Sequence, residues 1–188
     1  MLLLAFVFLS FLTNTSHLVS AEGNGYAREA CRVTRYPDLC VHSLSSFSNI
    51  AGRSPSKWAR AGVSVTIGEV KSVQAYLKRY RRVRGRNRVA LSDCIENFAD
   101  ALDELHRSLG VLRKLSKSTF GTQMGDLNTW ISAAFTDAGS CLDGFEGQKG
   151  RQIKLLQNRV RNASYITSNA LALVNKLAAT GSESISDP

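Results

Sequence analysis

A long amphipathic segment in the middle of the chain constrains its fold more than any other feature. Between residues 90 and 115 the apolar side chains recur at alternating steps of four and three, as on one side of an α-helix. They are Leu91, Ile95, Phe98, Leu102, Leu105, Leu109 and Leu112. At about 100° per residue, Glu96, Asp100 and Asp103 fall on the opposite side. We therefore expect one side to enter a core and the acidic side to stay free for a partner.

Three further segments show the same spacing. Ser54 and Pro55 begin the first as cap and first-turn residue, and its apolar positions continue to Tyr80. Residues 63–67 alternate as a strand would, but the helical spacing runs well past strand length. The other two segments span residues 125–145 and 151–177. Four long helices with short connections predict an all-α fold, an up-and-down four-helix bundle.

The region before the bundle predicts a small helical hairpin over residues 22–52. It turns at Tyr36 and Pro37, because proline suits the first turn of a helix. We assign the bundle to residues 53–180 and expect a polar, disordered tail over residues 181–188.

The first 21 residues are almost wholly apolar and contain no Asp, Glu, Lys or Arg. They end in Val19-Ser20-Ala21, which is typical of a secretory signal peptide cleaved near Ala21. A transmembrane anchor is the alternative, but the polar residues 13–16 interrupt the apolar run. We therefore expect secretion, with no membrane attachment after cleavage. Asn162 begins an Asn-Ala-Ser glycosylation sequon, although it lies within a predicted helix.

The chain has four cysteines, Cys31, Cys40, Cys94 and Cys141. In an oxidising compartment they should form two disulfides, and three pairings are possible. A Cys31–Cys40 bond would close a short loop, and a Cys94–Cys141 bond would close a long one. The sequence has no C-x-x-C, which disfavours a zinc or redox site.

The net charge of +9 is concentrated in one part of the chain. Residues 53–88 hold eleven basic side chains against a single acidic one, Glu69. The densest part, the arginine segment of residues 78–88, contains Arg79, Arg81, Arg82, Arg84, Arg86 and Arg88. It is either a solvated connection between helices or an anion patch for an acidic polysaccharide. Only Tyr76 and Tyr80 accompany these arginines, which is a weak indication of nucleic-acid binding.

Motifs for catalysis and cofactor binding are absent from the sequence. It contains no G-x-S-x-G, no H-E-x-x-H and no glycine-rich phosphate loop. Glu96, Asp100 and Asp103 could be considered as metal ligands, but side chains on consecutive turns of one helix project in parallel and do not converge. We therefore interpret the chain as a binding protein that uses no cofactor or metal, and not as an enzyme.

Three stretches of the sequence carry a specific combination of residues and spacing. They are CRVTRYPDLC at residues 31–40, ALSDCIENFADALD at residues 90–103, and WISAAFT at residues 130–136 continuing to CLDGF at residues 141–145. Together they resemble the plant invertase/pectin methylesterase inhibitor family. The resemblance covers nearly all of the chain after the signal peptide. It implies a four-helix bundle behind a disulfide-tied hairpin, with Cys31 bonded to Cys40 and Cys94 bonded to Cys141.

Two inhibitory activities occur in the family that this sequence resembles, one against pectin methylesterase and one against acid invertase of the cell wall or vacuole. The invertase inhibitors share a Pro-Lys-Phe motif, whereas this chain has Ser118-Thr119-Phe120 in that region. The resemblance therefore favours inhibition of pectin methylesterase in the cell wall, in a one-to-one complex that covers the enzyme's pectin-binding cleft. The contact positions that it implies are Glu96, Asp100, Asp103, Asn128, Thr136, Ser140 and Asp143. A non-inhibitory wall protein that binds acidic pectin through the arginine segment is a more distant alternative.

Overall fold

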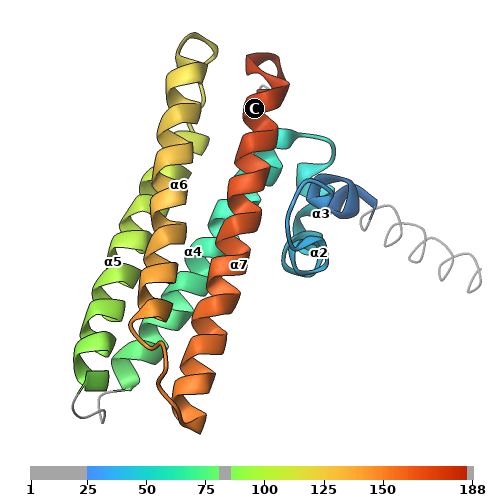
Figure 1. The fold of residues 1–188 in the computed structure, drawn as a ribbon. Coiled ribbons are helices and arrows are strands. Elements are labelled where there is room, and N and C mark those ends of the chain that lie inside the picture. Colours follow the sequence, from blue (N-terminus) through green and yellow to red (C-terminus); the bar gives the residue numbers. More distant parts are fainter. Residues whose placement is uncertain (1–24, 81–85, 186–188) are drawn as a thin grey trace, which may run out of the picture.

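The computed structural model describes residues 25–80 and 86–185, apart from the side chain of Arg86, and it is helical with no strand over these residues (Figure 1). The predicted signal peptide lies outside the described residues. So do Arg81, Arg82 and Arg84 of the arginine segment.

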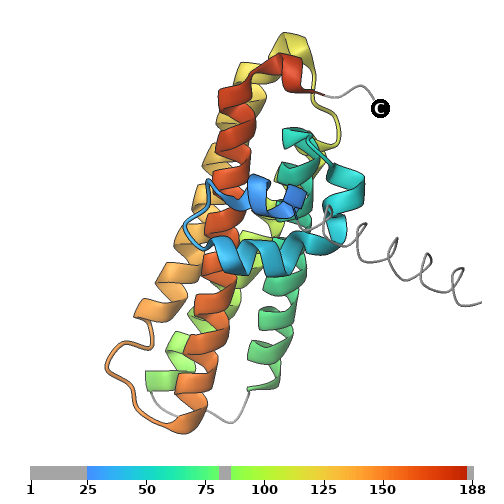
Figure 2. The same ribbon diagram turned by 90° about the vertical axis from the view of Figure 1, so that its right-hand side faces the viewer.

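Four long helices form the bundle: α4 (Pro55–Arg79), α5 (Arg86–Leu112), α6 (Phe120–Asp143) and α7 (Arg151–Thr180). Successive helices run in opposite directions, and α4 packs against α5 and α7 while α6 packs against the same two from the other side (Figures 1 and 2). The predicted all-α bundle is therefore confirmed.

Helix α4 begins where its sequence predicts. The Ser54 side chain accepts a hydrogen bond from the Lys57 N–H at 3.4 Å, and Pro55 occupies the first turn. The serine oxygen satisfies one of the free N–H groups at the start of the helix, and proline has no N–H that would need a partner. The helix then buries Val63, Val70, Val73 and Leu77 along one side. Residues 63–67 are thus helical, as the longer spacing predicts.

The buried side of α5 differs from the predicted one by a small rotation. Phe98 and Leu105 are buried as expected, but Ile95 and Leu102 are only half-buried. Short side chains are buried in their place, namely Cys94, Ala101 and Ser108. Helix α6 contributes equally short ones, Ala134, Ala138 and Cys141. Since the distance between packed helices depends on the side chains between them, short residues on both helices allow α5 and α6 to approach closely.

Helix α6 begins at Phe120, five residues before the expected start at residue 125. A short 3-10 helix, η2 (Lys117–Thr119), precedes it. Phe120 and Met124 are both buried, one turn apart, so the helix extends the core in this direction. Gln123 fixes the connection from α5, because its side-chain Oε1 accepts from the Ser116 N–H at 2.9 Å and its Nε2 donates to the Lys114 carbonyl at 3.0 Å.

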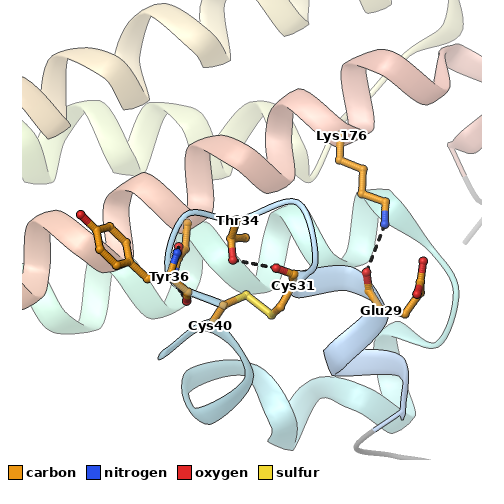
Figure 3. Close-up of a disulfide and its surroundings, with 7 residues drawn as sticks. Glu29, Cys31, Thr34, Tyr36, Cys40 and Lys176 are labelled. Carbon is orange, nitrogen blue, oxygen red and sulfur yellow. Dashed lines mark hydrogen bonds between the residues drawn. A yellow bond between two sulfur atoms is a disulfide. The ribbon is translucent and has the colours of Figure 1, made fainter. Parts of the chain in front are cut away.

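The N-terminal hairpin lies across the outside of α4 and α7 (Figure 2). Its first arm is helical over residues 25–31, and its second arm is α2 (Pro37–Leu44), which continues through η1 (Ser45–Phe47) and α3 (Ser48–Ala51). A disulfide between Cys31 and Cys40 ties the two arms together (Figure 3). Within this loop the Thr34 hydroxyl donates to the Cys31 carbonyl at 2.7 Å.

A buried asparagine of α7, Asn169, holds the turn of the hairpin on the bundle. Its Oδ1 accepts from the Tyr36 N–H at 3.1 Å, and its Nδ2 donates to the Tyr36 carbonyl at 3.0 Å. One turn earlier on α7, the Tyr165 ring stacks on the Tyr36 ring with centroids 4.0 Å apart. A single amide therefore bonds to both backbone polar groups of the residue that precedes Pro37, and the Tyr36 carbonyl also accepts from the Cys40 N–H at 2.9 Å.

The structure continues past α7 into the segment that the sequence predicts as a disordered tail. Residues Ser182–Ser184 form a short 3-10 helix, η3. Glu183 forms an ion pair with Lys117 at 3.1 Å, and Ile185 packs half-buried against the core. The segment 181–185 is thus attached to the bundle by contacts that its local polarity does not reveal.

We predict that Asn169→Ala lowers the free energy of unfolding by about 2 kcal/mol, because it removes two hydrogen bonds and leaves the Tyr36 N–H without a partner, while the Tyr36 carbonyl keeps its bond from the Cys40 N–H. Urea unfolding followed by circular dichroism would measure this loss. Asn49→Ala, which alters an exposed asparagine of α3, is the matched control and should change the value by less than about 0.5 kcal/mol. Equal effects of the two substitutions would contradict the role given to Asn169.

Candidate functional site

The surface that α5 and α6 share carries most of the predicted contact residues. A second disulfide joins Cys94 of α5 to Cys141 of α6. Because the helices are antiparallel, this bond sets the turns with Glu96 and Asp100 beside the turns with Ser140 and Thr136. All four of these side chains are exposed, and so are Asp103 and Asp143. All seven predicted positions lie on these two helices, and the structure brings six of them together on the surface that the helices share.

Asn128 is the exception among the predicted contact residues. Its Nδ2 donates to Oδ1 of Asn175 at 2.8 Å, so the side chain turns towards α7 and not towards α5. It also lies eight residues before Thr136, about 12 Å along the helix axis. The structure does not bring Asn128 together with the acidic side chains of α5.

Two carboxyl groups that the sequence does not single out, Glu104 of α5 and Asp137 of α6, lie at the border between these helices. Both are half-buried, and they interact electrostatically with each other and with Asp100. Burial raises the pKa of Glu104 to about 7, with further contributions from the negative charges of Asp137 and Asp100, while Arg107 acts in the opposite direction. Burial and then Asp100 raise the pKa of Asp137. One oxygen of Glu104, Oε2, is buried and has no hydrogen-bond partner among the described residues.

The rotation of α5 explains why Glu104 escapes sequence analysis. If the core side were centred on Ile95 and Leu102, Glu104 would point to solvent on the free side of the helix. With Ala101 and Ser108 buried instead, Glu104 moves to the border with α6. Asp137 lies one turn before Cys141. A disulfide from Cys141 to Cys94 is the one signal in the sequence that would place Asp137 near α5.

We predict that the stability of the protein falls as the pH rises from about 4.5 to about 7. A glutamate in the unfolded chain has a pKa near 4.5, whereas Glu104 in the folded chain has a pKa of about 7. Between these values the folded state binds more protons than the unfolded state, so the free energy of unfolding decreases with increasing pH. The raised pKa of Asp137 acts in the same direction.

Glu104→Gln should reduce this pH dependence, because an amide cannot ionise. Urea unfolding of both proteins at a series of pH values from 4.5 to 7.5 would measure the two slopes. Glu96→Gln removes one carboxylate from an exposed position of the same helix and serves as the control. If Glu104→Gln leaves the slope of the unfolding free energy against pH unchanged, the pH dependence does not come from the raised pKa of Glu104.

Arg79 and Arg88, the two arginines of the arginine segment whose side chains the structure describes, are exposed at the end of the bundle where α4 stops and α5 starts. At the glycosylation sequon, the Asn162 Nδ2 donates to Oε1 of Glu69 on α4 at 3.1 Å. A glycan would have to replace this hydrogen bond between α4 and α7, and glycosylation of Asn162 stays a prediction.

Among residues 25–80 and 86–185, no group of three or more His, Cys, Asp or Glu side chains is arranged to hold a metal ion. None of the helices that the structure describes is both long enough and apolar enough to cross a membrane.

The fold and this surface define a helical-bundle domain that presents polar side chains from two closely packed helices. The family model "Plant invertase/pectin methylesterase inhibitor" matches residues 26–173. Pectinesterase inhibitor 6 of Arabidopsis thaliana is 46% identical over 172 residues, which cover 89% of this chain and 82% of that protein. Pectinesterase inhibitor 3 of the same plant is 35% identical over 179 residues, covering 90% and 87%.

Similarity to a solved structure concerns the fold alone. The crystal structure of mutant form A of a pectin methylesterase inhibitor from Arabidopsis superposes with a TM-score of 0.63 at 19% identity, covering 77% of this chain and 92% of that one. From the family model and the relatives together, the chain belongs to the plant invertase/pectin methylesterase inhibitor family. Membership places it among protein inhibitors and not among enzymes.

Proposed function

We propose that this protein inhibits pectin methylesterase and so limits the de-esterification of cell-wall pectin. The observation that carries the proposal is the 46% identity to a pectinesterase inhibitor along most of both chains. The branch of the family that acts on invertase has a Pro-Lys-Phe motif, and in this chain η2 and the start of α6 carry Ser118-Thr119-Phe120 instead. Inhibition of acid invertase is therefore the second candidate.

The inhibitory surface in this proposal is the exposed side of α5 and α6, centred on Asp100. The disulfide between Cys94 and Cys141 and the short residues around it hold the two helices in one arrangement. A surface that is rigid before binding loses little conformational freedom in a complex. Such a surface would cover the substrate cleft of one enzyme molecule and keep pectin from its catalytic groups, giving a one-to-one complex.

The compartment follows from the signal segment and from the substrate. The apolar residues 1–21 are consistent with secretion, and pectin is a polymer of the cell wall. We therefore place the protein outside the cell, in the wall space, with the two disulfides formed.

A parallel titration tests this function directly. The mature, disulfide-intact protein would be added to a plant pectin methylesterase and, separately, to a cell-wall invertase at mildly acidic pH. We expect stoichiometric loss of methylesterase activity and unchanged invertase activity. Loss of invertase activity alone would establish the second candidate, and loss of neither activity would overturn both.

We predict that Asp100→Lys weakens inhibition of the methylesterase by about tenfold or more, because it reverses a charge at the centre of the proposed contact. The inhibition constant of each variant would be measured with the same enzyme. Asp38→Lys makes the same change at an exposed position of α2 in the hairpin and should leave inhibition unchanged. Unchanged inhibition by a folded Asp100→Lys variant would remove Asp100 from the contact surface.

A further inference from the structure

A basic groove lies along the start of α7. This is the end of the bundle where α4 stops and α5 starts (Figure 1). The groove is open to solvent, has a volume of about 490 Å³, and lies between α7 and residues 148–150, which precede the helix. Four cations line it: Lys149, Arg151, Lys154 and Arg161. Lys154 and Arg161 are seven residues apart on one side of the helix, so the positive charges extend over about 10 Å.

Two glutamines fix the wall of this basic groove. The Gln148 Nε2 donates to the Gly144 carbonyl at 3.0 Å, and the Gln157 Nε2 donates to the Phe145 carbonyl at 3.1 Å. These bonds join the connecting segment both to itself and to α7, and the groove therefore has a defined shape. Its polar lining could also hydrogen-bond to an uncharged, hydroxyl-rich ligand.

No carboxylate of the described residues neutralises the four cations. The two ion pairs in the described part of the chain join Arg32 to Glu29 and Lys117 to Glu183, both elsewhere. Glu146 lies in the same connecting segment and is exposed, yet it forms no ion pair with the groove. The Arg161 guanidinium donates a long hydrogen bond of 3.4 Å to Oδ1 of Asn158, which is an uncharged group.

Lys149, Arg151 and Lys154 lie at the N-terminal end of α7, where positive side chains destabilise a helix. The N-terminus of a helix carries partial positive charge and is stabilised by acidic side chains. Helix α7 has no acidic residue in its first turn and no side-chain cap, and it begins with Arg151 after Lys149. Helix α5 starts at the same end of the bundle, also without an acidic residue in its first turn, and Arg88 near its start is exposed (Figures 1 and 2). An anion bound in the groove would relieve this repulsion at the start of α7.

We infer that the basic groove binds a carboxylated polysaccharide, with uronate carboxylates on Lys149, Arg151, Lys154 and Arg161. A polymer with a carboxylate on each sugar matches a line of separated cations better than a single small anion does. The neighbouring Arg79 and Arg88 extend the positive surface for such a chain. Methyl esters carry no charge, so the groove would distinguish de-esterified from esterified pectin.

This site goes beyond inhibition, because it lies at the start of α7 and not on the α5–α6 surface. Its ligand is the product of pectin methylesterase. Binding would therefore hold the inhibitor on those stretches of pectin where the enzyme has already acted.

The test measures retention of the full mature protein on immobilised polygalacturonate, with the fully methyl-esterified polymer as the uncharged counterpart. We expect retention on polygalacturonate that sodium chloride reverses, and none on the ester. The quadruple variant Lys149→Gln, Arg151→Gln, Lys154→Gln, Arg161→Gln should bind polygalacturonate about tenfold more weakly or worse, since several exposed ion pairs are lost together.

The matched control removes four exposed cations from the opposite end of the bundle: Arg53→Gln, Lys57→Gln, Arg113→Gln and Lys114→Gln. Retention of this variant should equal that of the wild type. Equal losses of retention in both quadruple variants would show that net charge alone governs retention, and would overturn the proposal. So would wild-type retention on the ester equal to that on polygalacturonate, or no wild-type retention on polygalacturonate. Inhibition of the methylesterase is measured in parallel, because a groove variant that still inhibits is folded, and a failed groove leaves the proposed function standing.

Discussion

The close approach of α5 and α6 is the constraint on which the candidate surface depends. Cys94 and Cys141 bond across it with their Cα atoms 4.4 Å apart, and both helices bury short side chains, among them Ala101 of α5 and Ala138 of α6. This contact fixes the rotation of α5 about its own axis, and the rotation decides which carboxyl groups stay in water and which are partly buried. Asp100 remains exposed, while Glu104 is drawn to the border with Asp137. A few short residues in the core thus set the charge pattern of the outer surface.

Much of the fold could be predicted because it follows from local spacing. Steps of three and four along α4 and α7 specify helices whatever their neighbours are, and Ser54 with Pro55 marks a start that the structure retains. The boundary of α6 was harder, because Phe120 and Met124 are separated by polar residues and a lone pair gives little periodicity. The contact between Asn169 and Tyr36 could not be predicted, since 133 residues separate them and neither belongs to a motif that specifies the other.

The candidate site shows the same division between local and long-range information. Glu96, Asp100 and Asp103 can be placed on one side of a helix from α5 alone, and they are exposed as that argument requires. Asp137 comes from another helix, and its relation to Glu104 exists only once rotation and register are set. Asn128 also depends on another helix, because its exposed side chain bonds to Asn175 of α7. Sequence patterns identify the helix that bears a group but not the neighbour towards which that group turns.

The two charged regions of the molecule are incompatible with a single partner. A polyuronate would be repelled by the carboxylates around Asp100 and attracted by the cations around Lys154, whereas a protein surface with basic side chains would behave in the reverse manner. The basic groove lies at the first turns of α7, and the acidic surface lies along α5 and the second half of α6. Because the two regions lie on different helices, an enzyme and a polysaccharide could be bound together. The acidic surface would bind the enzyme and repel the polysaccharide, and the basic groove would do the reverse.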